Sequence, residues 1–226
     1  MSTQYRTLID VLRRRAGEQS EKLAYTFLND DGIETSKLTY GELDRQARAI
    51  GALLQRTITQ GDRVLLFYPP GLEYVAAFFG CLYAGAIAVP AYPPRHNRNL
   101  LRLQTLLKDA EPTVALTESR ILLRLAPETA KDSPFAALTW QVSDNIPQGL
   151  EHDWHEPDLT DQTLALLQYT SGSTSAPKGV MVSHRNLLHN EQMIQTCFQQ
   201  TEESTIVGWL PLYHDMGLIG NVIQPL

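Results

Sequence analysis

Apolar residues along this 226-residue chain follow a helical spacing in some segments and form short continuous runs in others. In Tyr40–Gln55 they recur three or four positions apart, directly after a capping box formed by Thr39 and Glu42. Similar signals predict further helices at Thr7–Arg15, Leu72–Ala84, Leu100–Lys108 and Arg185–Phe198. The short apolar runs predict strands at Leu23–Leu28, Val64–Tyr68, Ile87–Val89, Thr113–Leu116, Leu164–Tyr169 and Val180–Val182.

The alternation of these elements indicates the fold class. Short apolar strands separated by helices long enough to cross over are typical of a parallel sheet that is covered on both faces. We therefore predict an α/β fold with mostly parallel sheets flanked by helices. The segment Lys131–Asp161 is rich in polar residues and contains prolines, but Trp140 and Trp154 indicate that it packs against the rest. We interpret it as a connection and not as a domain boundary.

The segment Tyr74–Pro94 carries no charged residue and is long enough to cross a bilayer. Gly80 and Gly85 interrupt it, prolines end it, and alanine is more frequent in it than leucine. We therefore expect a buried helix that turns at Gly85 into a buried strand Ala86–Val89, and no membrane span.

Composition and charge argue against several classes of partner. The chain has 19 Lys and Arg against 25 Asp and Glu, a net charge of −6, and no basic cluster beyond Arg13–Arg15. We expect that run to be a solvated helix face, so nucleic acid and anionic membranes are not predicted as main partners. Cys81 and Cys197 lie in apolar or helical patterns and are interpreted as reduced packing residues. Because the start also lacks the features of a secretory signal, we predict a cytoplasmic protein.

The last residues differ from an ordinary terminus. Met216–Leu226 contains no charged residue, whereas natural termini are usually solvated at the surface. We therefore expect the chain to be cut within a domain.

The strongest chemical feature is Leu167–Val180, where a small hydroxyl-rich loop joins two predicted strands. A polyphosphate requires many hydrogen-bond donors close together and a cation, and this loop supplies both. Gly172 lets the backbone approach an anion, Lys178 supplies the positive charge, and Pro177 restricts how far the loop can collapse. Hydroxyl donors are contributed by Thr170, Ser171, Ser173, Thr174 and Ser175.

Other phosphate and hydrolase motifs do not match this loop. A Walker A loop needs Ser or Thr after its lysine, but Gly179 follows Lys178. The GxSxG elbow of hydrolases fails because Thr174 occupies its central position, and no GxGxxG follows a predicted strand. A Ser/Gly run by itself is more often a flexible turn. Here the predicted buried strands on both sides and the closing Pro-Lys-Gly favour a binding loop.

The segment Tyr169–Gly179 resembles the phosphate-binding signature of the adenylate-forming superfamily, which includes acyl-CoA synthetases, luciferases, nonribosomal peptide adenylation domains and fatty acyl-AMP ligases. One departure is Ser175, where the family usually has glycine. The resemblance implies that residues 1–226 are the first part of the large N-terminal AMP-binding domain of such an enzyme, and that this part alone is inactive. It also implies that ATP is bound by Thr170, Ser171, Gly172, Ser173, Thr174, Ser175, Lys178 and Gly179.

A second motif, Gly208–Gly220, is an apolar strand-like run interrupted by His214 and Asp215. By itself such a pair is more often structural than catalytic, and a metal phosphohydrolase would need further ligands. We assign no metal ligand in this chain, because no recognised metal-ligand spacing is found at His152, His155, His184 or His189.

The resemblance places the second motif at the border of the carboxylate pocket. In relatives that activate α-amino acids, an aspartate at the place of His214 pairs with the substrate ammonium, whereas a histidine gives no fixed counter-charge. A plain carboxylic acid is therefore the implied substrate, with His214 near its carboxylate and Gly217 leaving room for the acyl chain. The implied catalytic residues are His214 and Lys178, and the implied pocket residues are His214, Asp215, Met216 and Gly217.

The segment Trp209–Gly220, together with Ala88–Pro94 and Leu167–Tyr169, most resembles the fatty acyl-AMP ligases, with CoA-forming synthetases second. This implies ATP-dependent activation of a fatty acid to acyl-AMP, assisted by Mg²⁺ whose main ligand lies outside these residues. The acyl group then passes to the phosphopantetheine thiol of an acyl carrier protein or of a downstream synthase module. Three alternatives stay open: a long- or medium-chain fatty acyl-CoA synthetase, a non-catalytic remnant or interaction module, and a metal phosphohydrolase.

Overall fold

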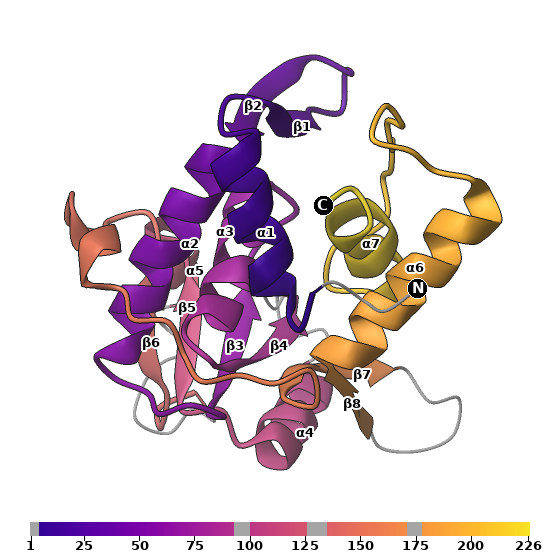
Figure 1. The fold of residues 1–226 in the computed structure, drawn as a ribbon. Coiled ribbons are helices and arrows are strands. Elements are labelled where there is room, and N and C mark those ends of the chain that lie inside the picture. The colour runs from indigo at the N-terminus through magenta and orange to yellow at the C-terminus, as the bar shows by residue number, and fades with distance from the viewer. Residues whose placement is uncertain (1–4, 93–99, 126–134, 171–177) are drawn as a thin grey trace.

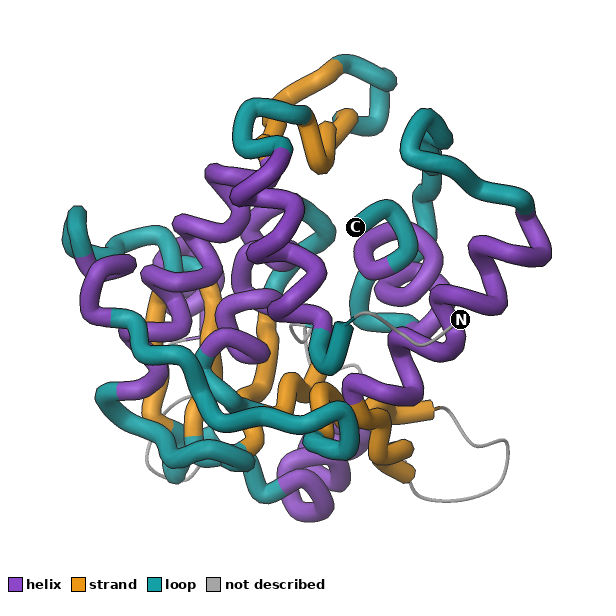
Figure 2. The backbone as a smooth tube through the Cα atoms, in the orientation of Figure 1, coloured by secondary structure: helices purple, strands orange, loops and turns teal. Residues whose placement is uncertain are grey.

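The computed structural model describes residues 5–92, 100–125, 135–170 and 178–226, and is built around a six-stranded sheet (Figure 1). A small antiparallel sheet of β1 (Leu23–Leu28) and β2 (Glu34–Thr39) lies apart from it (Figure 2). The strand order of the large sheet is β6-β5-β3-β4-β7-β8. Its strands are β3 (Arg63–Phe67), β4 (Ile87–Ala91), β5 (Val114–Thr117), β6 (Thr139–Val142), β7 (Leu164–Thr170) and β8 (Lys178–Ser183). All neighbouring pairs are parallel except β7 with β8, which confirms the predicted α/β class.

Helices cover both faces of the large sheet. The first layer consists of α1 (Leu8–Glu18), α2 (Tyr40–Gln55) and α3 (Leu72–Tyr83), and α4 (Leu100–Ala110) packs on the other face. The remaining helices are α5 (Ser119–Leu125), η2 (Leu150–Asp153), α6 (His184–Phe198), α7 (Asp215–Leu218) and η3 (Ile219–Ile223).

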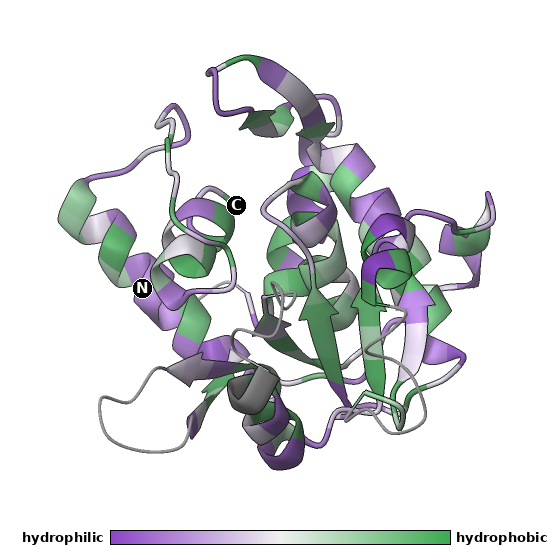
Figure 3. Ribbon diagram, turned by 180° about the vertical axis from the view of Figure 1, so that it is seen from behind, coloured by the Kyte–Doolittle hydropathy of each residue, from purple (hydrophilic) through white to green (hydrophobic). Residues whose placement is uncertain are grey.

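The alternation of side chains along β3 shows why its sequence is a continuous apolar run. Val64 and Leu66 belong to the core beneath the first helical layer, while Leu65 and Phe67 belong to the core beneath α4. All four side chains are fully buried, and the central strands are hydrophobic when seen from behind (Figure 3). A strand that is covered on both faces needs apolar residues at every position.

The uncharged segment that contains α3 is a buried helix followed by a buried strand, as predicted. Every residue of α3 except Glu73 is buried, and a Cβ at Gly80 would overlap Ile50 of α2. Gly85 has a φ of +75° and turns the chain into β4. Across the residues described here, no helix combines the length and the hydrophobicity that crossing a membrane requires.

The segment predicted to be a connection contains the edge strand β6. Trp140 on this strand stacks on Phe67 with ring centroids 5.7 Å apart, and Trp154 donates its indole N–H to the Tyr83 carbonyl at 2.7 Å. Both tryptophans therefore pack as predicted. The apolar pattern does not predict β2, β6 or α5, because these elements are short or largely polar.

Three expectations about burial and strand content are wrong. Strand β8 is not buried, because it lies at the sheet edge, and Val180 and Met181 are 49% and 69% exposed. Residues 208–213 form no strand, because they run as a loop to the start of α7. Cys81 is buried as expected, but Cys197 is exposed near the end of α6 and packs against no core.

The Arg13–Arg15 run on α1 is only partly solvated. Long arginine side chains can cover an aromatic ring while their charge stays in contact with water. The three guanidinium groups lie, in chain order, over the rings of Trp154, Tyr5 and Tyr40.

Candidate functional site

The two strands that flank the predicted phosphate loop bring its ends together. In the antiparallel pair of β7 and β8, Thr170 lies directly opposite Lys178. Lys178 is exposed and forms no ion pair with any residue that the structure describes. An exposed ammonium and a hydroxyl at the base of the same loop suit an anionic ligand. The loop residues Ser171, Gly172, Ser173, Thr174 and Ser175 lie outside the described residues.

The base of the loop is anchored to α4 through Tyr169. Its hydroxyl donates to Oδ2 of Asp109 at 2.5 Å, and its ring packs on Gly179, where a Cβ would lie 2.9 Å from the ring carbon Cζ. Burial and then the bond to Asp109 raise the pKa of the Tyr169 hydroxyl above its ordinary value, so it stays a donor at neutral pH. Gly179 thus has a packing reason to be glycine, and its assignment to ATP stays a prediction.

His214 and Asp215, which the second motif predicts to be functional, contact each other. His214 is the N-cap residue of α7, and its Nδ1 lies 2.6 Å from Oδ1 of Asp215. Asp215 also accepts the backbone N–H of Met216 at 2.7 Å, which holds its carboxylate at the first turn. Because 64% of the His214 side chain is exposed, a ligand can reach the imidazole from solvent.

The peptide between Tyr213 and His214 is held at both ends. The side-chain amide of Gln168 on β7 donates to the Tyr213 carbonyl at 3.1 Å, and the His214 N–H donates to the Pro211 carbonyl at 3.1 Å. The Tyr213 ring also packs edge-on against Tyr92, which follows β4, with centroids 5.2 Å apart. The strand that carries the phosphate loop therefore also contacts the segment that carries His214. Sequence reasoning missed Gln168, although a polar residue inside a buried apolar run was a signal.

Gly208 and Gly217, on either side of the segment that carries His214, allow other groups to approach the backbone closely. A Cβ at Gly217 would overlap the Pro211 carbonyl, and a Cβ at Gly208 would overlap the Asn221 side chain. Gly217 is buried, and Met216 beside it is 66% exposed. The backbone contact explains the glycine at position 217 by itself, so the room that it leaves for an acyl chain stays a prediction.

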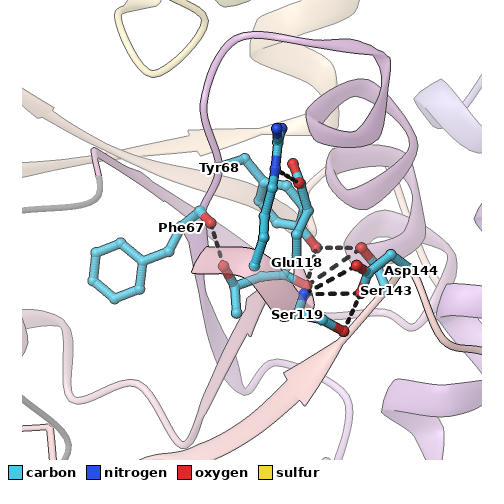
Figure 4. Close-up of polar contacts among 8 residues, drawn as sticks. Phe67, Tyr68, Glu118, Ser119, Ser143 and Asp144 are labelled. Atoms are coloured by element: carbon cyan, nitrogen blue, oxygen red, sulfur yellow. Dashed lines mark hydrogen bonds and ion pairs between the residues drawn. The ribbon is translucent and has the colours of Figure 1, made fainter. Parts of the chain in front are cut away.

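Polar residues that follow the carboxyl ends of β3, β5 and β6 form a hydrogen-bond network (Figure 4). The Tyr68 hydroxyl donates to Ser143 Oγ at 2.7 Å, and Ser119 donates both its N–H and its hydroxyl to Oδ1 of Asp144 at 2.9 Å. The carboxyl ends of parallel strands are where such sheets often bind ligands. Here the side chains bind mainly one another, and we assign the network a structural role.

An open cavity of about 720 Å³ lies between α1 and α2. Three of the four arginines that line it form ion pairs, with Arg13 bound to Glu156, Arg48 at 2.7 Å from Asp44 and Arg14 at 2.9 Å from Glu18. None of its lining residues comes from β7, β8 or the segment around His214. The cavity is therefore not part of the candidate site.

His184 lies outside the candidate site and joins α1 to α6. It is buried, its Nδ1 accepts the backbone N–H of Leu8 at 3.2 Å, and burial lowers its pKa to about 4. Within the described residues, no group of three or more His, Cys, Asp or Glu side chains is placed to hold a metal ion.

Comparisons with known proteins agree with one another. Residues 12–226 match the family described as AMP-binding enzyme. The chain is 46% identical to a medium-chain-fatty-acid–[acyl-carrier-protein] ligase from Moorena producens, over 99% of this chain and 38% of that protein. It is 38% identical to a putative fatty-acid–CoA ligase from Mycobacterium tuberculosis, over 97% of this chain and 39% of that protein.

A solved structure is similar over nearly the whole chain. It is the fatty acyl-adenylate ligase from Legionella pneumophila in complex with acyl adenylate and pyrophosphate, with a TM-score of 0.90 and 41% identity. The match covers 98% of this chain and 38% of that one. The chain therefore spans less than half the length of these three relatives.

Proposed function

Because the chain belongs to the family of AMP-binding enzymes, we propose that residues 1–226 are the first part of the N-terminal AMP-binding domain of a fatty acyl-AMP ligase. The whole protein uses ATP to convert a fatty acid to acyl-AMP and releases pyrophosphate. The relatives support this proposal, because one is named as a fatty-acid ligase of carrier proteins and another was solved with acyl adenylate and pyrophosphate.

The observation that carries the proposal is the pair of strands β7 and β8, because β7 also contacts the segment that carries His214. Thr170 and Lys178 face each other at the base of the loop, and the lysine charge has no partner among the described residues. In the proposal these two residues, with Ser171–Ser175 and Gly179, hold the phosphates of ATP. Developing negative charge on the leaving pyrophosphate is then stabilised by a fixed cation and by aligned donors.

His214 and Asp215 orient the carboxylate in this proposal. A fatty acid is ionised at neutral pH, so it needs positioning and no general base to attack the α-phosphorus. With both ring nitrogens protonated, His214 donates its Nε2–H to a carboxylate oxygen, while its Nδ1–H donates to Asp215 at 2.6 Å and holds the ring. Met216 and Gly217 line the adjoining part of the pocket.

Mg²⁺, when bound, would neutralise part of the charge on the phosphates. As the resemblance to adenylate-forming enzymes implies, the proposal places the main protein ligand of Mg²⁺ elsewhere in the whole protein. What residues 1–226 contribute to phosphate binding is the charge of Lys178 and the donors of the loop.

The acyl group passes, in this proposal, to the phosphopantetheine thiol of a carrier protein or of a downstream synthase module, in the cytoplasm. The name of the Moorena producens relative supports a carrier protein, and the free thiols of Cys81 and Cys197 support a reducing compartment. The name of the Mycobacterium tuberculosis relative, a putative fatty-acid–CoA ligase, supports free CoA as the second candidate acceptor. Since both acceptors present the same thiol arm, discrimination must come from contacts beyond that arm.

Product analysis with the full-length protein tests the proposal. The protein is incubated with ATP, Mg²⁺ and fatty acids of graded chain length, and with equal concentrations of holo-carrier protein or CoA. We expect acyl-AMP without an acceptor and acyl-carrier product with one, and no acyl-AMP from residues 1–226 alone. Robust acyl-CoA formation would make the protein a CoA synthetase, and absence of acyl-AMP with every acid would refute the proposed activation.

A further inference from the structure

We propose that Gln168 is a positioning residue, which orients His214 toward the carboxylate by fixing the peptide between Tyr213 and His214. This inference rests on the function proposed above. Gln168 lies in β7 two residues before Thr170, and its side chain is 7% exposed. Because it is buried and its amide nitrogen donates to the Tyr213 carbonyl, its effect on the reaction passes through the backbone that it holds.

The orientation of the Gln168 amide follows from its partner. Its Nε2 lies 3.1 Å from the Tyr213 carbonyl oxygen, and that oxygen can only accept a hydrogen bond. The reversed amide would place two oxygens against each other, so the nitrogen must face Tyr213. The contact joins residues that are 45 positions apart and links the phosphate-loop strand to the segment before α7.

The oxygen end of the Gln168 amide lowers the stability of the fold. Oε1 of Gln168 is buried and has no hydrogen-bond partner among the described residues. A buried polar atom without a partner destabilises the fold relative to an apolar side chain of the same shape. The reason for an amide at this position is therefore the hydrogen bond that its nitrogen donates to the Tyr213 carbonyl.

The contact at Tyr213 determines the direction of the His214 side chain. A peptide unit is planar, so fixing its carbonyl and its N–H leaves little freedom of rotation. Gln168 holds the carbonyl of this unit, and the Pro211 carbonyl holds its N–H at 3.1 Å. On the other side of the residue, the Leu218 N–H donates to the His214 carbonyl at 2.9 Å. With the backbone held on both sides, φ of His214 stays near −95° and the direction of its Cα–Cβ bond is fixed. Strand β7 thus holds Thr170, where the phosphate loop begins, and through Gln168 it also fixes the backbone that carries the imidazole.

The test replaces Gln168 with methionine in the full-length protein, because methionine has a similar shape and no donor. We expect a Tm close to that of wild type, since the unpartnered oxygen is removed while the Tyr213 carbonyl loses its donor. We expect kcat/KM for the fatty acid in pyrophosphate exchange to fall about fivefold, the size of one neutral hydrogen bond, while KM for ATP changes by less than about twofold.

Gln141→Met is the matched control. Gln141 lies on β6, its Nε2 donates to Thr57 Oγ1 at 2.7 Å, and its Oε1 is also buried without a partner among the described residues. It contacts neither motif, so this variant should keep wild-type kinetics for both substrates.

Gln168→Glu adds a pH profile that a purely structural role would not produce. A protonated carboxyl can donate to the Tyr213 carbonyl, whereas an ionised one repels it. Relative to wild type, kcat/KM of this variant for the fatty acid should therefore fall as pH rises, and Gln168→Met should show no such slope.

The inference is overturned if Gln168→Met leaves fatty-acid kinetics unchanged, if it weakens ATP and fatty acid equally, or if Gln168→Glu and Gln168→Met have parallel pH profiles. These outcomes leave the proposed function intact, because they require an active wild-type enzyme. A wild-type protein without fatty-acid-dependent exchange contradicts the proposed function itself and this inference with it.

Discussion

Replacing Lys178 with alanine in the full-length protein separates a role in phosphate binding from a role in folding. The side chain is exposed, lies opposite Thr170, and has no ion pair with the residues that the structure describes. Truncating an exposed side chain of this kind changes the free energy of unfolding by no more than about 0.5 kcal/mol. We therefore expect Tm to stay within about 2 °C of wild type.

The expected loss of activity is much larger than the loss of stability. A hydrogen bond that involves a charged group contributes about 1.5 to 3 kcal/mol. At about 1.4 kcal/mol per factor of ten, this corresponds to a roughly 10- to 150-fold slower reaction. Because Lys178 is exposed and water screens its charge in part, we expect a value near the lower end, at least about tenfold.

Fatty-acid-dependent exchange of labelled pyrophosphate into ATP measures this step without any thiol acceptor. Lys37→Ala is the matched control, because Lys37 is also exposed but lies on β2 in the small sheet, apart from the loop. It should exchange at the wild-type rate. An unchanged rate in Lys178→Ala would refute the phosphate-loop assignment, and a large drop in its Tm would show that the lysine has a structural role.

Two further predictions concern stability. Burial lowers the pKa of His184 to about 4 from 6.5, so between these values the unfolded chain binds a proton that the folded chain does not. The contribution of His184 to the free energy of unfolding should therefore be largest above about pH 6.5 and fall by up to ~3 kcal/mol toward pH 4. Burial raises the pKa of Glu191 to about 8, which gives an opposite slope, so the His184 contribution is measured as the difference between wild type and His184→Gln in urea unfolding at several pH values. Parallel curves of the two proteins would contradict it. Gly217→Ala, which forces a methyl group against the Pro211 carbonyl, should cost about 2 kcal/mol in thermal unfolding, whereas Gly220→Ala meets nothing within 4 Å and should cost nothing. Equal effects of the two alanines would contradict the role assigned to Gly217.

Local patterns were sufficient for several elements of the α/β fold. Helix α2 spans Tyr40–Gln55 as predicted, because its capping box and its apolar spacing both lie within one short segment. The helix α3 and the strand after Gly85 follow in the same way from a continuous apolar run. The phosphate-loop motif is also contiguous, so its ends at Thr170 and Lys178 could be found without knowing the fold.

Only the tertiary structure decided which of these elements meet. The strand order β6-β5-β3-β4-β7-β8 depends on where each crossover returns, and β8 is exposed because it lies at the edge of that order. The hydrogen bond from Gln168 to Tyr213 joins a buried strand to a loop 45 residues later. The period of a side-chain pattern reports how one element is buried. It carries no information on the path of the connecting chain, and that path determines which distant groups come within hydrogen-bonding distance.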